Sequence, residues 1–386
     1  MKKLPIAFTL LSAALLVAAC SSSKKTETPV APASNGEILV AEVDSFTGSQ
    51  SFFGTFSRSG IQLAISQTND AGGVGGRKIR LVTVDDQGKP EMTEAVVKKL
   101  IKEQKVVAVL GASASSRSLA MAPLLQKAGI PMITPASTNP EVTGAGDYIF
   151  RTCFIDTFQG SVMAKFVREN LKAKKVAILR DSDSKYSLGL AEFFKDRFVA
   201  MGGQIVADEA YKAGDVDFKR QLTAIRPKAP DVIYVPGYYT DVANIIPQAR
   251  TMKISATFAG GDGWDSNELY KIGEGSTAPS YFTNHYAPGS TDPVHLKFAT
   301  AYKAKFRTDS NADAALGYDA ATVLFDAMKR AKSLSGPDLR DAIAQTKNFP
   351  GVTGVITLDA NRDAIKSVVI FKVQGKKTEF IESIAP

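Results

Sequence analysis

The sequence predicts an α/β protein with two lobes, each a mostly parallel sheet flanked by helices. The chain has 386 residues, which is more than a single hydrophobic core usually organises. Short apolar runs alternate with helical patterns from residue 37 onward, as they do in βαβ units around a parallel sheet. The alternation occurs in two series, the second beginning near Phe158, so we expect two lobes of the same architecture.

Residues 1–19 have the pattern of a secretory signal peptide. A positive start at Lys2 and Lys3 is followed by an apolar stretch that is too short for a stable membrane span. Small residues then precede Cys20, which resembles a bacterial lipoprotein signal with a lipid on this cysteine; a plain signal peptide is the alternative. Residues 20–36 are rich in Pro, Ser and Ala without apolar periodicity, so we expect a flexible tether behind the lipid anchor.

The first series predicts four strands with helices between them. The run at residues 106–111 is continuous and apolar, which is typical of a buried parallel strand. In the segment before it, Val97 and Leu100 belong to an apolar stripe at helical spacing. The expected strands are residues 37–43, 77–85, 106–111 and 130–135, and the expected helices are residues 53–69, 90–104 and a segment that starts at Ser115 or Ser116.

The second series and the C-terminal segment predict further strands and helices. The expected helices are residues 158–170, 188–201, 217–225 and 241–252, and the expected strands are residues 175–181, 203–209, 231–237, 257–261 and 280–288. Three helical patterns follow from about Pro293, and the chain ends in strands around residues 354–358, 367–373 and 378–384. These last elements are too few for a third domain. We therefore expect residues 37–156 with 287–362 to form lobe 1, and residues 157–286 with 363–386 to form lobe 2.

Two strand-to-loop junctions carry the same polar chemistry. The strand at residues 106–111 is followed by Ser113, Ser115 and Ser116, and we expect Ser115 or Ser116 to be the N-cap of the next helix, a ready anion site. The strand at residues 130–135 ends in Ala136, Ser137, Thr138 and Asn139. Ligands of open α/β sheets bind at the carboxyl ends of the strands. Both junctions are therefore predicted to line one pocket.

Most motifs of catalysis and of cofactor binding are missing from the sequence. It has two histidines, His285 and His295, which we expect at the surface, and it has no nucleophile elbow, phosphate loop or H-E-x-x-H motif. The glycine-rich residues 71–77 follow a helix and precede a strand, the reverse of the dinucleotide-binding order. We therefore expect no enzyme, no cofactor and no metal site. In AGGDGWD, by contrast, Asp262 follows a strand and offers a carboxylate, with an exposed turn as the alternative.

The net charge and the cysteine content limit the classes of partner and the disulfide bonds that we expect. The formal charge is +8, and removal of Lys2 and Lys3 with the signal would lower it to +6. No basic run is interleaved with aromatic residues, so we expect no nucleic-acid binding. If Cys20 carries lipid, Cys153 is the remaining thiol and has no partner for an intramolecular disulfide. Its setting in YIFRTCF predicts a small buried residue.

From about residue 37 to residue 386 the chain resembles the periplasmic binding proteins of the leucine/isoleucine/valine type. The motifs that carry the resemblance are LVTVDDQGKP, AVLGASASS, MITPASTNPEVT, DVIYVPGYYTD and FAGGDGW. The resemblance implies the type I periplasmic-binding fold, with two α/β lobes joined by three crossings and a ligand between them. It also implies a monomeric extracytoplasmic lipoprotein that captures a small amino acid, aliphatic or branched-chain, and delivers it to an ABC permease in the membrane.

The same resemblance implies roles for individual residues of lobe 1. Ser115 and Thr138 would be hydroxyl partners of the α-carboxylate and the α-ammonium of the ligand. Backbone groups near Ser113 and Ala136 would lie beside them. Phe53 would line the end of the pocket that holds the ligand's side chain, and ordinary core packing is the alternative for this ring.

On lobe 2, the resemblance implies that Asp262 pairs with the ammonium and that Tyr186 and Tyr238 close over the ligand, again with core packing as the alternative. Two features depart from the family pattern. Gln87, Gly88 and Ala114 stand where some members carry a disulfide, and the acid is Asp where several amino-acid binders have Glu. The identity of the ligand's side chain therefore stays open. Two alternative functions also stay open: a sensing module of a signalling receptor, and a binder of an amide or aromatic acid.

Overall fold

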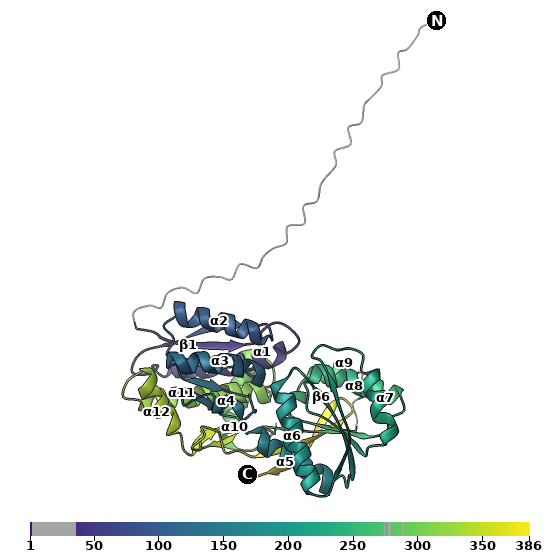
Figure 1. Ribbon diagram of the computed structural model, residues 1–386. Helices are drawn as coiled ribbons and strands as arrows, with labels where there is room; N and C mark the ends of the chain where they lie inside the picture. The colour runs from purple at the N-terminus through teal and green to yellow at the C-terminus, as the bar shows by residue number, and fades with distance from the viewer. Residues whose placement is uncertain (2–35, 274, 277–278, 288) are drawn as a thin grey trace. The chain divides into compact units, whose positions relative to one another are not determined.

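Two separate sheets hold the strands predicted for the two lobes, as Figure 1 shows. The computed structural model describes residues 1, 36–273, 275–276, 279–287 and 289–386. The predicted signal peptide, the lipidation site at Cys20 and nearly all of the predicted tether lie outside the described residues. Among the described helices, none is long and apolar enough to cross a membrane.

The first sheet is fully parallel and has the strand order β2-β1-β3-β4-β5. Its strands are β1 (Ile38–Asp44), β2 (Ile79–Asp85), β3 (Ala108–Gly111), β4 (Met132–Thr134) and β5 (Ile149–Arg151). The first four confirm the predicted strands. Strand β5 was not predicted, because three residues are too short to show a period.

Helices cover both faces of this sheet because its strands are apolar on both faces. Leu39, Ala41 and Val43 of β1 pack with α2 (Pro90–Glu103) and α3 (Ser115–Ala128). The alternate residues Ile38 and Val40 face α1 (Ser51–Asp70) and the helices α11 (Ala312–Arg330) and α12 (Gly336–Ala344). The first lobe therefore contains C-terminal helices, as predicted. A short helix, α4 (Glu141–Gly144), was not predicted.

The second sheet has seven strands in the order β14-β13-β10-β9-β8-β6-β7. Strands β6 (Lys175–Asp181), β7 (Gln204–Tyr211), β8 (Val232–Val235), β9 (Thr257–Gly260) and β10 (Ser280–Asn284) run parallel to their neighbours in the series. The last strands, β13 (Val368–Gln374) and β14 (Lys377–Ile384), extend the sheet in antiparallel fashion. A small separate hairpin pairs β11 (Phe349–Gly351) with β12 (Gly354–Ile356).

The remaining helices follow the predicted order. They are α5 (Asp156–Glu169), α6 (Lys185–Ala200), α7 (Lys219–Ile225), α8 (Tyr239–Thr251), α9 (Asn267–Ile272) and α10 (Pro293–Phe306), with short 3₁₀ helices at Arg226–Lys228 and Asp262–Trp264. The chain passes between the lobes after β5, after β10 and after β12. This agrees with three crossings, while the exact lobe boundaries given above stay predictions.

Two glycines allow α1 and α11 to pack backbone against backbone. A Cβ atom on Gly60 would lie 1.9 Å from the carbonyl oxygen of Ala314, and one on Gly317 would lie 2.3 Å from the carbonyl oxygen of Ser57. Contacts that short are impossible for any side chain, so glycine is required at both positions. The first turn of α11 is thereby held against α1.

A buried arginine ties the third crossing to the first lobe. Arg151, at the end of β5, is fully buried and forms an ion pair with Asp363, which lies just after β12. Its guanidinium also donates to the carbonyl oxygens of Ser137 and Asn139 and to the hydroxyl of Thr143. Since a planar guanidinium can satisfy several acceptors at once, one side chain fixes both the β4 junction and the crossing.

Replacing Arg151 with Ala should lower the free energy of unfolding by about 3–5 kcal/mol, because Asp363 would keep a buried charge without its partner. Urea denaturation monitored by circular dichroism measures this change. The control is Lys303→Ala, which removes an exposed pair with Asp309 and should cost less than about 1 kcal/mol. Equal costs for the two variants would contradict the role given to Arg151.

Candidate functional site

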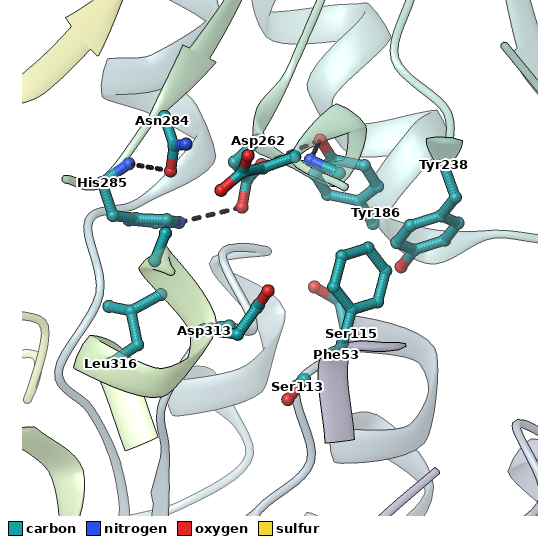
Figure 2. A pocket seen from close by; sticks show the side chains of 14 residues that line it. Phe53, Ser113, Ser115, Tyr186, Tyr238, Asp262, Asn284, His285, Asp313 and Leu316 are labelled. Atoms are coloured by element: carbon teal, nitrogen blue, oxygen red, sulfur yellow. Dashed lines mark hydrogen bonds and ion pairs between the residues drawn. The ribbon is translucent and has the colours of Figure 1, made fainter. Parts of the chain in front are cut away.

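One cavity is lined by residues of both lobes and encloses about 430 Å³ of space free of protein atoms, part of it open to solvent. All the predicted ligand-binding residues except Thr138 line it. The lining residues are Phe53, Ser113, Ser115, Ala136, Tyr186, Tyr238, Asp262, Gly263, Asp265, Asn284, His285, Ala312, Asp313 and Leu316 (Figure 2).

The β3 junction differs in detail from the prediction. The N-cap of α3 is Ala114, whose side chain cannot cap, and Ser115 is the first residue of the helix. The expectation that Ser115 or Ser116 caps α3 was therefore wrong, because the helix begins one residue early. The Ser115 Oγ accepts from the backbone N–H of Asn139 at 3.2 Å, which joins the two predicted junctions. The first N–H groups of α3 still have no partner within the helix, so its N-terminus favours an anion.

Ser113 is held by a buried carboxylate behind the cavity. Its backbone N–H and its hydroxyl both donate to Asp44 Oδ2, at 3.0 and 2.5 Å. Burial, with a contribution from Asp86, raises the pKa of Asp44 to about 6. The N–H of Ser113 is thus engaged within the protein. Its hydroxyl oxygen faces the cavity with lone pairs only.

Thr138 lies behind the cavity wall. It is buried, and its carbonyl oxygen accepts from the backbone N–H of Asp156, the first residue of α5. Burial, followed by repulsion from Asp262, raises the pKa of Asp156 to about 8, and the hydroxyl of Thr138 offsets part of that rise. Thr138 Oγ1 is buried without a hydrogen-bond partner in the described structure, and the neighbouring Asp156 was not among the predicted site residues.

Asp262 projects into the cavity from the 3₁₀ helix after β9 (Figure 2). Its Oδ1 accepts from Tyr186 Oη at 2.8 Å, and its Oδ2 lies 2.9 Å from His285 Nε2. Its backbone N–H donates to Gln159 Oε1 at 2.9 Å. A Cβ atom on the preceding residue, Gly261, would lie 2.3 Å from Tyr186 Oη, so glycine is needed for this approach.

His285 and His295 are buried, so the prediction of surface histidines was wrong. His285 follows β10 directly, lines the cavity and stacks on Phe154 with ring centroids 3.7 Å apart. Burial lowers its pKa although Asp262 acts in the opposite direction, so the ring is neutral near pH 7 and Nε2–H donates to Asp262. His295 packs on Tyr286 away from the cavity. The position of His285 after a parallel strand was the signal that could have revealed it.

Asp313 and Leu316 come from the first turn of α11, and sequence reasoning missed both. The carboxylate of Asp313 points into the cavity opposite Asp262 (Figure 2). Burial raises the pKa of Asp313 well above its ordinary value, and repulsion from Asp265, Asp262 and Asp44 adds to the rise. The sequence offers no local signal for this residue because only tertiary packing brings α11 to the cavity.

The predicted aromatic residues line the cavity and also belong to the hydrophobic core. Tyr186 and Tyr238 have ring centroids 5.3 Å apart, and Phe53 of the first lobe lies 5.8 Å from Tyr238. The two lobes also touch directly, because Tyr239 Oη donates to the carbonyl oxygen of Ser49 at 2.7 Å. These rings therefore pack in the core and line the cavity at the same time, and their contact with a ligand stays a prediction.

One cysteine lies among the described residues, Cys153. Cys153 is fully buried and unpaired, as predicted, and burial raises its pKa to about 12. Within the described part of the chain, no group of His, Cys, Asp and Glu side chains is arranged to hold a metal ion.

Comparisons with known proteins relate this architecture to one family. A family profile described as "Periplasmic binding protein" matches residues 37–378. The Leu/Ile/Val-binding protein BraC3 of Rhizobium johnstonii is 30% identical over 350 residues, covering 90% of this chain and 94% of the relative. The crystal structure of a leucine binding protein, LivK of Thermotoga maritima, is 39% identical with a TM-score of 0.87, covering 90% of this chain and 99% of LivK. LivJ of Streptococcus pneumoniae, in complex with isoleucine, is 34% identical with a TM-score of 0.85, covering 91% and 100%.

The raised pKa of Asp156 gives a testable dependence of stability on pH. The unfolded chain releases this proton near pH 3.8, whereas the folded protein keeps it until about pH 8. The folded state therefore loses stability as pH rises through this window. Asp156→Asn removes the ionisation, so its stability advantage over the wild type should grow from pH 5 to pH 8, by about 1–3 kcal/mol. Urea denaturation at several pH values measures it, and parallel curves for the two proteins would contradict the assignment.

Proposed function

The chain belongs to the periplasmic binding protein family, and we propose from this membership that it captures a small amino acid in the cavity and delivers it to an ABC importer. The observation that carries the proposal is the pairing of the α3 N-terminus with the carboxylate of Asp262 in one cavity. An amino acid is a zwitterion and needs an anion site and an acidic group a few ångströms apart. Relatives named for leucine, isoleucine and valine support an aliphatic side chain.

In this proposal the α-carboxylate binds the first lobe. The free N–H groups at the start of α3 and the hydroxyl of Ser115 are its donors. The α-ammonium binds Asp262, whose two oxygens each have one neutral donor, Tyr186 or His285, and keep lone pairs for the ligand. The carbonyl oxygen of Ala136 is a further acceptor at the edge of the cavity.

Binding by two lobes couples capture to closure. The anion site lies on the first lobe and Asp262 on the second, so a ligand that bridges them favours the arrangement in which the lobes meet. Tyr186 and Tyr238 cover the ligand from the second lobe, and Phe53 contacts it from the first. An importer can then distinguish loaded from empty protein by the arrangement of the lobes.

We place the protein outside the cytoplasm, as its family implies, and propose that lipid on Cys20 holds it at the membrane as a monomer. The basis for the anchor is the N-terminal sequence pattern. The proposed role is binding without chemical turnover. The cavity's histidine is a neutral donor to Asp262, which is a part in binding and not in nucleophilic catalysis.

Replacing Asp262 with Asn should weaken binding of the preferred amino acid about 100-fold or more, because the ammonium would lose its charged partner in a buried site. Isothermal titration calorimetry with the twenty amino acids identifies the ligand and measures the loss. The matched control is Asp196→Asn, on the exposed surface of α6, which should leave the affinity unchanged. If no amino acid binds the wild type, the proposed function fails.

The two hydroxyl residues predicted for lobe 1 should differ in effect. Ser115→Ala removes a group that lines the cavity and should weaken binding about tenfold. Thr138 does not line the cavity, so Thr138→Ala should weaken binding less than about threefold and should instead shift the pH dependence of stability through Asp156. Titration calorimetry on both variants compares the losses. A larger loss for Thr138→Ala would mean that this hydroxyl reaches the ligand directly.

A further inference from the structure

The cavity carries more carboxyl groups than a simple amino acid requires. Its lining includes three carboxyl groups, those of Asp262, Asp265 and Asp313, and no Lys or Arg among the described residues that line it. A ligand with one ammonium group is satisfied by Asp262. The other two carboxyl groups therefore need an explanation, since a buried charge is costly without a partner.

Two of these carboxyl groups have side-chain hydrogen-bond donors within the protein. Asp262 accepts from Tyr186 Oη and from His285 Nε2, and Asp265 has the side chain of Asn284 as its hydrogen-bond donor. Both are thus held in place from the second lobe. They form that wall of the cavity before any ligand arrives.

Asp313 differs from the other two carboxyl groups in its hydrogen-bond partners. It is buried, with an exposed fraction of 7%. Its one side-chain partner in the described structure is Asn311 Nδ2, at the long distance of 3.4 Å from Oδ2. Its carboxylate is directed into the cavity (Figure 2). Burial and the neighbouring acids Asp265, Asp262 and Asp44 raise its pKa, which shows that the protein itself provides little to balance a charge here.

The surroundings of Asp313 offer further acceptors and a short apolar wall. The hydroxyl of Ser113 gives its proton to Asp44, so only its lone pairs face the cavity. Leu316 follows Asp313 by one helical turn, and Phe53 lines the same cavity from α1. This combination suits a few methylene groups that end in a hydrogen-bond donor with positive charge.

We propose that Asp313 determines specificity and that the preferred ligand is a small amino acid whose side chain ends in an amino group. This inference rests on the proposed function, in which Asp262 takes the α-ammonium, and it replaces the aliphatic side chain proposed there with one that ends in an amino group. Asp313 then takes the second ammonium, with Ser113 as an additional acceptor, while Leu316 and Phe53 contact the methylene groups between the two charges. A hydrocarbon side chain would instead leave the carboxyl group of Asp313 buried with only the long contact to Asn311.

Titration calorimetry on the full folded chain tests this with matched ligands. L-Ornithine and L-2,4-diaminobutyrate carry the second amino group, whereas L-norvaline has the same chain as ornithine without it, and L-leucine represents the branched aliphatic class. We expect at least one diamino acid to bind more than tenfold tighter than norvaline and leucine. Asp313→Leu should reverse this order, with loss of diamino acid binding by about 100-fold and a gain for leucine.

The control compares two variants of the same helix. Asp326→Asn changes a carboxylate that pairs with Arg330 away from the cavity, and Asp313→Asn changes a carboxylate that lines the cavity. Only the second should weaken diamino acid binding, and thermal denaturation verifies that both variants fold. If wild type prefers leucine and Asp313→Leu leaves the order of ligands unchanged, the inference is overturned while the proposed function stands. If none of the amino acids binds, the proposed function itself has failed.

Discussion

Asp262 keeps a carboxylate in the cavity with two neutral donors, and most of the cavity's second-lobe wall is arranged around that interaction. Tyr186 and His285 each reach one oxygen, and Gln159 accepts from the backbone of the same residue. His285 in turn is held by stacking on Phe154. Since neutral donors fix a carboxylate without cancelling its charge, the negative potential of the cavity is preserved for a cationic group of a ligand.

Much of this arrangement follows from local rules that a sequence displays. The βα alternation predicted the strands of both lobes, and polar residues after β3 and after β9 located Ser115 and Asp262, because ligands of such sheets bind at the carboxyl ends of the strands. The C-terminal segment was assigned to both lobes for a simple reason: it is too short to bury a core of its own. These predictions needed only period, length and connectivity.

Other features depend on contacts that no local pattern records. A lone histidine carries no periodicity, so the burial of His295 was not predictable from its neighbours, whereas the position of His285 directly after β10 was a usable signal. Strand β5 has three residues, which is below the length at which a period can be recognised. The start of α3 at Ser115 is a shift of one residue, within the usual uncertainty of helix boundaries. Asp313 reaches the cavity only because the chain returns to the first lobe after β10 and packs α11 there.

The backbone contact of α1 with α11 at Gly60 and Gly317 has a consequence for how such a pocket can diversify. These glycines let the backbones of the two helices touch at Ala314 and Ser57, and the side chain of Tyr318 adds a hydrogen bond to Gln67, whereas the side chain of Asp313 takes no part in these contacts. Position 313 can therefore change from acidic to apolar or aromatic while the frame stays fixed. One scaffold could then serve different solutes through single substitutions, with its folding left largely intact.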